Sequence, residues 1–121
     1  MTLPSERIAD HLAGRPIMVV GRAGMDIYPM PDGTRVEDAQ ELVNDVGGSS
    51  GNIAVSIAKQ GHPVMLLSAV SNDGVGRFVT RSIGEYGVDT QYCFVTTGLE
   101  RTSLAMAETT TDRPDVTIYR N

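Results

Sequence analysis

The sequence predicts an α/β fold in which a parallel sheet is flanked by helices. Two short apolar runs, 17–20 and 64–69, are typical of strands in such a sheet. Helical patterns occupy 49–61 and 73–87, and the order strand, helix, strand, helix indicates right-handed crossovers between parallel strands. Beyond Val88 the chain becomes rich in Thr and Val, which indicates strands of a second kind.

The N-terminal residues 1–14 are predicted to form a polar leader. Their helical pattern is weak, and Gly14 followed by Pro16 ends it. The apolar run from Ile17 to Val20 then predicts a strand that is buried on both faces. The domain itself is therefore expected to occupy residues 15–121.

A small antiparallel element is predicted after the first strand. The segment IYPMPDG, residues 27–33, holds two prolines and a turn signal. It leads into a mixed segment, 34–46, in which the alternation from Leu42 to Val46 is typical of a strand exposed on one side.

The first helix is predicted from its start signal, its apolar spacing and its stop signal. Ser49 or Ser50 can cap it, and Gly61 followed by Pro63 ends it. The apolar residues that recur at helical spacing are Ile53, Ala54, Ile57 and Ala58.

The second helix follows the strand-like run VMLLSA, residues 64–69. Asp73 in the loop SNDGVG is a candidate cap, and Gly87 ends the helix. Its predicted inner face consists of Phe78, Val79, Ser82, Ile83 and Tyr86.

The last third of the chain reads as a meander of short strands separated by turn-like segments. The predicted strands are Gln91 to Thr96, Thr102 to Glu108 and Val116 to Tyr119. An α/β layer with two or three parallel strands is thin for an enzyme core. We therefore expect this sequence to be an N-terminal portion of a longer chain.

The composition excludes several classes of partner. Ten basic and fifteen acidic side chains give a net charge of −5 over 121 residues, without the basic cluster that nucleic acids attract. The longest apolar run, 64–67, is far too short to span a membrane. His11 and His62 are too few for a metal cluster, and the single Cys93 favours a reducing cytoplasm.

The stretch GGSSGN, residues 47–52, allows two interpretations. Glycines permit a sharp turn and serines cap helices, so it can simply begin a helix. Alternatively, Gly47 and Gly48 let a ligand reach backbone N–H groups, and Asn52 offers a donor and an acceptor to a hydroxyl. A phosphate-binding P-loop is excluded because its lysine is missing.

Two charged residues also have both a structural and a functional interpretation. Asp26 can satisfy backbone N–H groups in a turn, or its oxygens can accept bonds from neighbouring sugar hydroxyls. It is expected at the same carboxyl edge of the sheet as GGSSGN, where ligands of parallel sheets gather. Arg120 can be a solvated charge or can pair with a substrate carboxylate.

The order of these motifs resembles the PfkB, or ribokinase-like, family of carbohydrate kinases. The matching stretches are IMVVGRAGMDI, DVGGSSGNIAVSIAKQGHPVMLLSAVSNDGVGRF, EYGVDT and the strand ending in IYR, which together span Ile17 to Arg120. The sequence departs from the family at Ser50, where a proline or small apolar residue is common, and at Ser71, where glycine is frequent. The resemblance implies a ribokinase-like parallel sheet with a small antiparallel β lid.

The resemblance further implies a sugar-binding site whose residues follow the strands of the sheet. They are Asp26, Gly47, Gly48 and Asn52. The site would lie under a lid built from about 27–46 and 91–119, which in such proteins often also forms a homodimer interface. Arg120 resembles the arginine that meets the carboxylate of keto-deoxy sugar acids.

The reaction implied is transfer of the ATP γ-phosphate, assisted by Mg²⁺, to a primary hydroxyl of a sugar or sugar acid. The family's catalytic base belongs to a GAGD segment that this sequence lacks, so no catalytic residue is expected within 15–121. ATP and Mg²⁺ are expected to bind mainly to a C-terminal part. The alternative is a non-catalytic fragment that binds sugar or dimerises.

Overall fold

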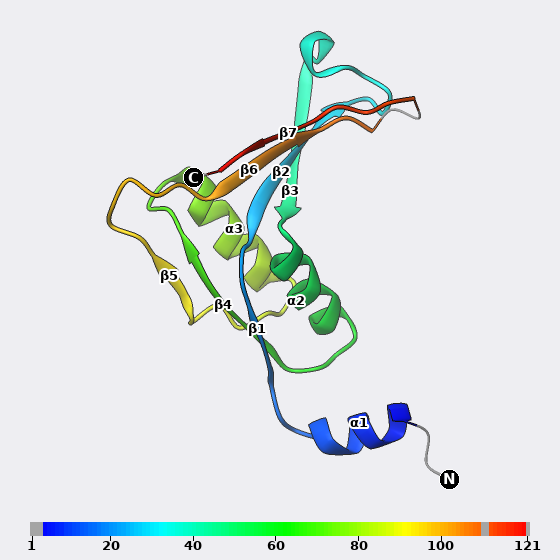
Figure 1. Ribbon diagram of the computed structural model, residues 1–121, viewed down its shortest axis with the longest axis vertical. Coiled ribbons are helices and arrows are strands. Elements are labelled where there is room, and N and C mark those ends of the chain that lie inside the picture. The colour runs from blue at the N-terminus through cyan, green and yellow to red at the C-terminus, as the bar shows by residue number, and fades with distance from the viewer. Residues whose placement is uncertain (1–3, 110–111, 121) are drawn as a thin grey trace.

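The chain forms two β-sheets and a pair of packed helices, and the computed structural model describes residues 4–109 and 112–120. Figure 1 shows one sheet projecting beyond α2 and α3, with α1 at the opposite end of the molecule. The elements are α1 Pro4–Leu12, β1 Ile17–Val20, β2 Gly24–Met30, the 3₁₀ turn η1 Val36–Asp38, β3 Glu41–Gly47, α2 Ser49–Lys59, β4 Val64–Val70, α3 Gly74–Glu85, β5 Cys93–Val95, β6 Ser103–Ala107 and β7 Val116–Tyr119.

The core sheet is parallel, as predicted, and has the strand order β1-β4-β5. Its central strand β4 buries every second residue, beginning with Val64 and Leu66, against α2 and α3. Val79 and Ile83 of α3 meet these side chains and are at most 1% exposed. Since truncating a buried Ile to Ala typically costs roughly 2–5 kcal/mol, this contact is a main source of stability.

The opposite face of the core sheet is open in the described part of the chain. Met18 and Val20 of β1 remain 47% and 65% exposed, and Phe94 of β5 remains 59% exposed. They share this face with Met65, Leu67 and Ala69 of β4, with which they are in register. The prediction that Ile17 to Val20 is buried on both faces is therefore wrong, because both helices lie on one side only.

Helix α2 begins differently from the prediction. Its N-cap is Gly48, with φ = 83°, and no side chain caps its first turn. Ser49 is exposed, while the Ser50 hydroxyl donates to the Val20 carbonyl at 3.4 Å. The predicted serine cap is wrong, because a left-handed backbone at Gly48 already brings the chain into the helix.

The buried face of α2 agrees with the prediction for Ala54, Ile57 and Ala58 but differs at its first turn. Ile53, predicted to face inward, is 52% exposed, whereas Gly51 and Val55 are buried beside Ala54. A Cβ at Gly51 would lie 3.2 Å from that of Ala23 and 3.3 Å from Val46 Cγ1. The helix therefore approaches the sheets most closely where it has no side chain.

Helix α3 agrees closely with its prediction. The Asp73 carboxylate accepts a hydrogen bond from the Gly76 N–H at 3.0 Å and so caps the helix as expected. Val79 and Ile83 form the inner face. Tyr86, assigned to the same face, is instead 39% exposed and carries the Lys59 ammonium 4.7 Å from its ring centre.

The outer sheet, with strand order β3-β2-β6-β7, is mixed and not purely antiparallel. Strand β2 is antiparallel to β3 but parallel to β6, which in turn is antiparallel to β7. Of the segment 27–33, which holds the turn signal, residues 27–30 belong to β2 and residues 31–33 form the turn. The predicted strand within 91–96 joins the core sheet as β5 instead of the meander.

Pro29 explains why strand β2 was not predicted from the sequence. Proline is rare inside sheets because it cannot donate to the ladder. In this sheet the pairing of β2 with β6 ends at Ile27, so Pro29 lies beyond it and pairs only with Leu42 of β3. A proline at this position therefore leaves the parallel ladder intact.

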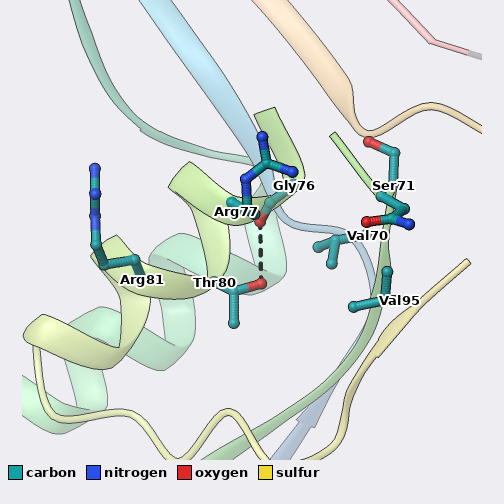
Figure 2. A pocket seen from close by; sticks show the side chains of 8 residues that line it. Val70, Ser71, Gly76, Arg77, Thr80, Arg81 and Val95 are labelled. Atoms are coloured by element: carbon teal, nitrogen blue, oxygen red, sulfur yellow. Dashed lines mark hydrogen bonds between the residues drawn. The ribbon is translucent and has the colours of Figure 1, made fainter. Parts of the chain in front are cut away.

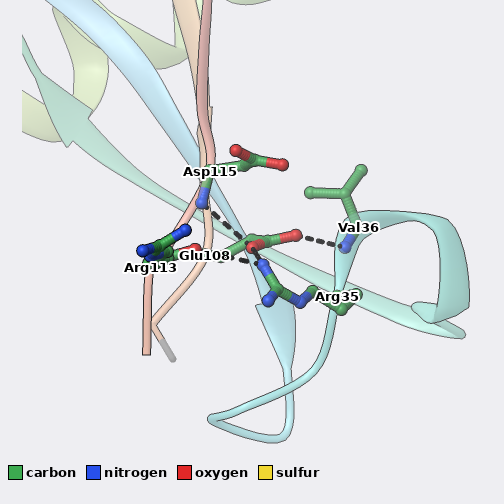
Figure 3. Close-up of polar contacts among 5 residues, drawn as sticks. All are labelled: Arg35, Val36, Glu108, Arg113 and Asp115. Carbon is green, nitrogen blue, oxygen red and sulfur yellow. Dashed lines mark hydrogen bonds and ion pairs between the residues drawn. The ribbon is translucent and has the colours of Figure 1, made fainter. Parts of the chain in front are cut away.

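A buried carboxylate joins the far end of the outer sheet to the segment before β3 (Figure 3). Glu108, which is 5% exposed, accepts hydrogen bonds from the N–H groups of Val36 and Asp115, both at 3.0 Å. Arg35 Nη1 donates to the same carboxylate at 2.7 Å and to the Arg113 carbonyl at 3.2 Å. These bonds replace the water that a carboxylate loses on burial.

Glu108→Gln is expected to weaken the outer sheet at any pH above about 4.3, and the difference from wild type should vanish only below the lowered pKa of folded Glu108. The N–H groups of Asp115 and Val36, with Arg35, hold the pKa of Glu108 below its ordinary value. The ionised group therefore contributes stability that is present above the unfolded pKa and lost as the pH falls through the folded pKa. Thermal unfolding of wild-type and variant protein across acidic and neutral pH measures this.

Glu41→Gln, which removes an exposed carboxylate from β3, is the matched control and should follow the wild-type profile. Superimposable profiles for Glu108→Gln and wild type would show that the network contributes nothing.

Candidate functional site

Asp26 lies in the middle of β2 on a half-buried face of the outer sheet. Its cross-strand neighbours on that face are Asp45 of β3 and Ala105 of β6. The Tyr28 hydroxyl donates to Asp26 Oδ2 at 3.3 Å. Burial and then the Asp26 charge raise the pKa of Tyr28, so this hydroxyl keeps its proton and orients the carboxylate.

Gly47 and Gly48 leave room beside this carboxylate. A Cβ at Gly47 would collide with Asp26 Oδ1, so the carboxylate occupies the space of the missing side chain. Gly48 has φ = 83°, and a Cβ there would approach the Arg22 carbonyl oxygen to 2.7 Å. Both positions therefore require glycine, for close approach at Gly47 and for backbone conformation at Gly48.

A hollow of about 130 Å³ opens where the outer sheet meets the start of α2. Its polar and glycine lining consists of Arg22, Gly24, Asp26, Gly48, Ser103 and Arg120. Leu104 and Ile118 add apolar walls. The hollow thus combines one carboxylate, two guanidinium groups and a hydroxyl.

The structure brings together most of the predicted site residues. Asp26, Gly48 and Arg120 line the same hollow, and Gly47 lies directly against the Asp26 carboxylate. Asn52 does not line the hollow; it is exposed on the first turn of α2, where its backbone N–H donates to the Gly48 carbonyl at 3.0 Å.

Sequence reasoning missed the two other polar side chains that line the hollow, those of Arg22 and Ser103. Arg22 stands in GRAG directly after the first strand, and that position was a usable signal. Ser103 reaches the site only because β6 pairs parallel to β2 and sets it opposite Gly24. No spacing in the sequence indicates that pairing.

A second hollow, of about 310 Å³, lies between α3 and the ends of β4 and β5 (Figure 2). Val70 and Val95 form part of its wall, and the Thr80 hydroxyl within it donates to the Gly76 carbonyl at 3.1 Å. Its lining contains arginines but no carboxylate. Because a carboxylate can accept hydrogen bonds from two adjacent sugar hydroxyls, the smaller hollow, which contains Asp26, is the better candidate for a sugar site.

The described residues offer no metal centre and no membrane-spanning helix. Residues 4–109 and 112–120 contain no group of three or more His, Cys, Asp or Glu side chains placed to hold a metal ion. None of the helices in these ranges is long and apolar enough to cross a membrane.

This arrangement of two sheets is found in kinases of known structure. A PfkB protein from Polaromonas sp. JS666 superimposes with a TM-score of 0.79 at 22% identity, covering 88% of this chain and 35% of that one. A fructokinase with bound ATP from Xylella fastidiosa gives a TM-score of 0.73 at 27% identity, covering 87% of this chain and 30% of that one. The predicted ribokinase-like α/β fold is confirmed.

The sequence pattern of the pfkB family carbohydrate kinases matches residues 15–121, and the chain belongs to this family. Among curated relatives, the 5-dehydro-2-deoxygluconokinase of Photobacterium profundum is 36% identical over 104 residues, covering 86% of this chain and 31% of that protein. The chain therefore spans about a third of the length of the relatives it matches.

Gly47→Ala is expected to displace the Asp26 carboxylate from the hollow, because the new methyl group would occupy the position of Oδ1. Loss of the Tyr28 contact and a change in the carboxyl ¹³C chemical shift of Asp26 would report the displacement. Gly84→Ala is the control, since its Cβ would meet nothing closer than 3.9 Å on an exposed helical surface. An unmoved Asp26 in Gly47→Ala would show that the fit is loose.

Proposed function

We propose that this chain is the acceptor-binding part of an ATP-dependent sugar kinase that phosphorylates a primary hydroxyl of 5-dehydro-2-deoxygluconate in inositol catabolism. Membership of the carbohydrate kinase family supports the reaction class. The name of the Photobacterium relative supports this acceptor. A cytoplasmic location, suggested by the single Cys93, stays a prediction.

The observation that carries the proposal is the meeting of Asp26, Arg22 and Arg120 in one hollow. A carboxylate accepts hydrogen bonds from two adjacent hydroxyls, and a guanidinium pairs with a carboxylate in a two-pronged geometry. A sugar acid carries both groups. The hollow therefore matches a polyhydroxy acid better than a neutral sugar.

The position of Asp26 in the sheet also supports a binding role. Asp45 lies directly opposite it, and like charges at such positions destabilise a sheet. An unfavourable pairing of this kind in an otherwise consistent fold is typical of a functional site. A ligand that donates hydroxyl protons to Asp26 would offset this repulsion.

This part of the kinase positions the acceptor, and the remaining two thirds supply the rest of the reaction. ATP with Mg²⁺ would provide the phosphoryl group, and we assign the base that activates the hydroxyl to the remainder of the kinase. Orientation alone contributes strongly to phosphoryl transfer. Asp26 and the two arginines fix which hydroxyl faces the ATP-binding part.

The open face of the core sheet fits the same assignment. Met18, Val20 and Phe94 expose an apolar surface that a complete α/β domain covers with helices. Relatives are about three times as long as the matched region. We therefore assign the remainder of the kinase to this face.

Other kinases of the family remain the alternative, with 2-keto-3-deoxygluconate, ribose, fructose or a nucleoside as acceptor. A non-catalytic fragment that binds sugar or dimerises is the second alternative. Exposed apolar side chains on the outermost strands of the outer sheet favour a homodimer in either case. They are Leu42, Val43, Val116, Ile118 and Tyr119.

Asp26→Asn in the full-length kinase is expected to raise the acceptor Kd by at least tenfold, because it removes the charged acceptor of the hydroxyl protons. Calorimetry with 5-dehydro-2-deoxygluconate measures this. Glu41→Gln is the matched control, since Glu41 pairs with Met30 on the same side of the sheet but lies outside the hollow. Equal affinity of Asp26→Asn and wild type would exclude the assigned site.

Arg120→Met should reduce the preference for acidic over neutral acceptors. Kinetics with a panel of sugar acids and the corresponding neutral sugars would give kcat/KM for each, and the acids should lose about tenfold or more while the neutral sugars change little. Arg15→Met, at an exposed position away from the hollow, is the control. Equal losses for both kinds of acceptor would contradict recognition of the carboxylate.

The outer-sheet dimer is tested by sedimentation of wild type and Val43→Glu. A charge at this exposed apolar position should convert a dimer to a monomer at the same protein concentration. A wild-type monomer at micromolar concentration would exclude the dimer.

A further inference from the structure

Two buried hydroxyls join the core to the outer sheet at one point. Ser71 directly follows β4, and Thr102 directly precedes β6. They are 3% and 8% exposed, although 31 residues separate them in the sequence. Polar side chains this deeply buried require hydrogen-bond partners.

The two residues satisfy each other reciprocally. The Ser71 N–H donates to Thr102 Oγ1 at 2.7 Å, and the Thr102 N–H donates to Ser71 Oγ at 3.0 Å. The two hydroxyl oxygens lie 2.8 Å apart. Each side chain therefore replaces the hydrogen bond that a neighbouring strand would give to the partner's backbone.

The direction of the hydroxyl bond follows from counting protons. The single proton of Ser71 Oγ is donated to Asp73 Oδ1 at 2.9 Å, so the Thr102 hydroxyl must be the donor between the two oxygens. Ser71 Oγ then accepts two bonds and donates one, which exhausts its capacity. The chain of donors runs from Thr102 through Ser71 to Asp73.

Asp73 anchors this chain in the core. Its carboxylate also accepts the Gly76 N–H at 3.0 Å, and these bonds hold the pKa of Asp73 below its ordinary value. Gly76 is in such close contact with the Ser71 carbonyl that a Cβ there would collide with it. The first turn of α3 and the residue before β6 are thus held as one unit.

The bonded pair of Ser71 and Thr102 lies next to the candidate site. Ser103, immediately after Thr102, lines the hollow and pairs in register with Gly24. A Cβ at Gly24 would approach the Ser103 carbonyl oxygen to 2.6 Å, so the two backbones have little freedom to shift. Any displacement of Thr102 would be passed directly to Ser103 in the wall of the hollow.

We propose that Ser71 and Thr102 are positioning residues for acceptor binding, which set β6 against β2 and so fix the width of the hollow. Both hydroxyls are fully engaged with protein groups and have no proton free for a substrate. They therefore act through Ser103 and the register of β6, not by contact. This inference rests on the proposed kinase function.

The test compares Ser71→Ala, Thr102→Val and Thr102→Ser in the full-length kinase. The first two variants leave a buried N–H without its partner, so the acceptor KM should rise roughly fivefold or more with kcat and the ATP KM nearly unchanged. Thr102→Ser keeps the hydroxyl and should restore the wild-type acceptor KM. Thr80→Val removes a hydroxyl bonded only within α3 and should leave the acceptor KM unchanged.

Amide hydrogen exchange provides a readout that does not depend on activity. Exchange at Thr102 and along β6 should accelerate roughly tenfold in Ser71→Ala and Thr102→Val, but not in Thr102→Ser or Thr80→Val. If Thr102→Val fails to fold, Ser71→Ala carries the same test, because it retains the bond from the Ser71 N–H to Thr102 Oγ1.

The outcomes separate this inference from the proposed function. Faster exchange along β6 with an unchanged acceptor KM would overturn the positioning role and leave a purely structural one. Unchanged exchange in both variants would overturn the inference altogether. If the wild-type kinase binds no sugar acid, the proposed function fails, and with it the role in acceptor binding, whatever the exchange rates show.

Discussion

The parallel pairing of β2 with β6 is the contact on which the rest of this structure depends. Three residues separate the end of β1 in the core sheet from the start of β2 in the outer sheet. Strand β6 starts at the same edge of the core sheet, because the residue before it is bonded to Ser71 at the end of β4. Because both strands start at that edge, they run in the same direction, and β3 and β7 add to their free sides. The candidate site lies where this pairing begins.

Strand β6 is held at both of its ends by buried polar groups. Ser71 bonds to the residue before the strand, and Glu108 closes the network at the residue after it. Both are satisfied by backbone N–H groups from distant parts of the chain, so each links segments that hydrophobic contact alone would leave free to slide. These bonds hold β6 in one register, and the register of β6 in turn fixes the position of the residues that it contributes to the hollow.

The sequence predicted what local chemistry determines. The helix ended by Gly61, the cap at Asp73 and the strand predicted at 64–69 all depend on residues close together in the chain. The misplaced features depend on distant partners. The strand 93–95 joins the core sheet by pairing with β4, and Ser103 reaches the hollow through a strand nearly eighty residues away. Asn52 was assigned by motif alone, and the geometry does not bring it into the hollow.

The one-sided burial of the core sheet has a consequence for biosynthesis. In a kinase of the relatives' length, this third of the chain leaves the ribosome first, with its two helices already able to cover one face of β4. Ribosomes add roughly 5–20 residues per second, so the apolar surface around Val20 and Phe94 would wait on the order of ten seconds or more for its cover. During that interval the nascent domain exposes an apolar surface, and chaperones that recognise such surfaces would bind to it.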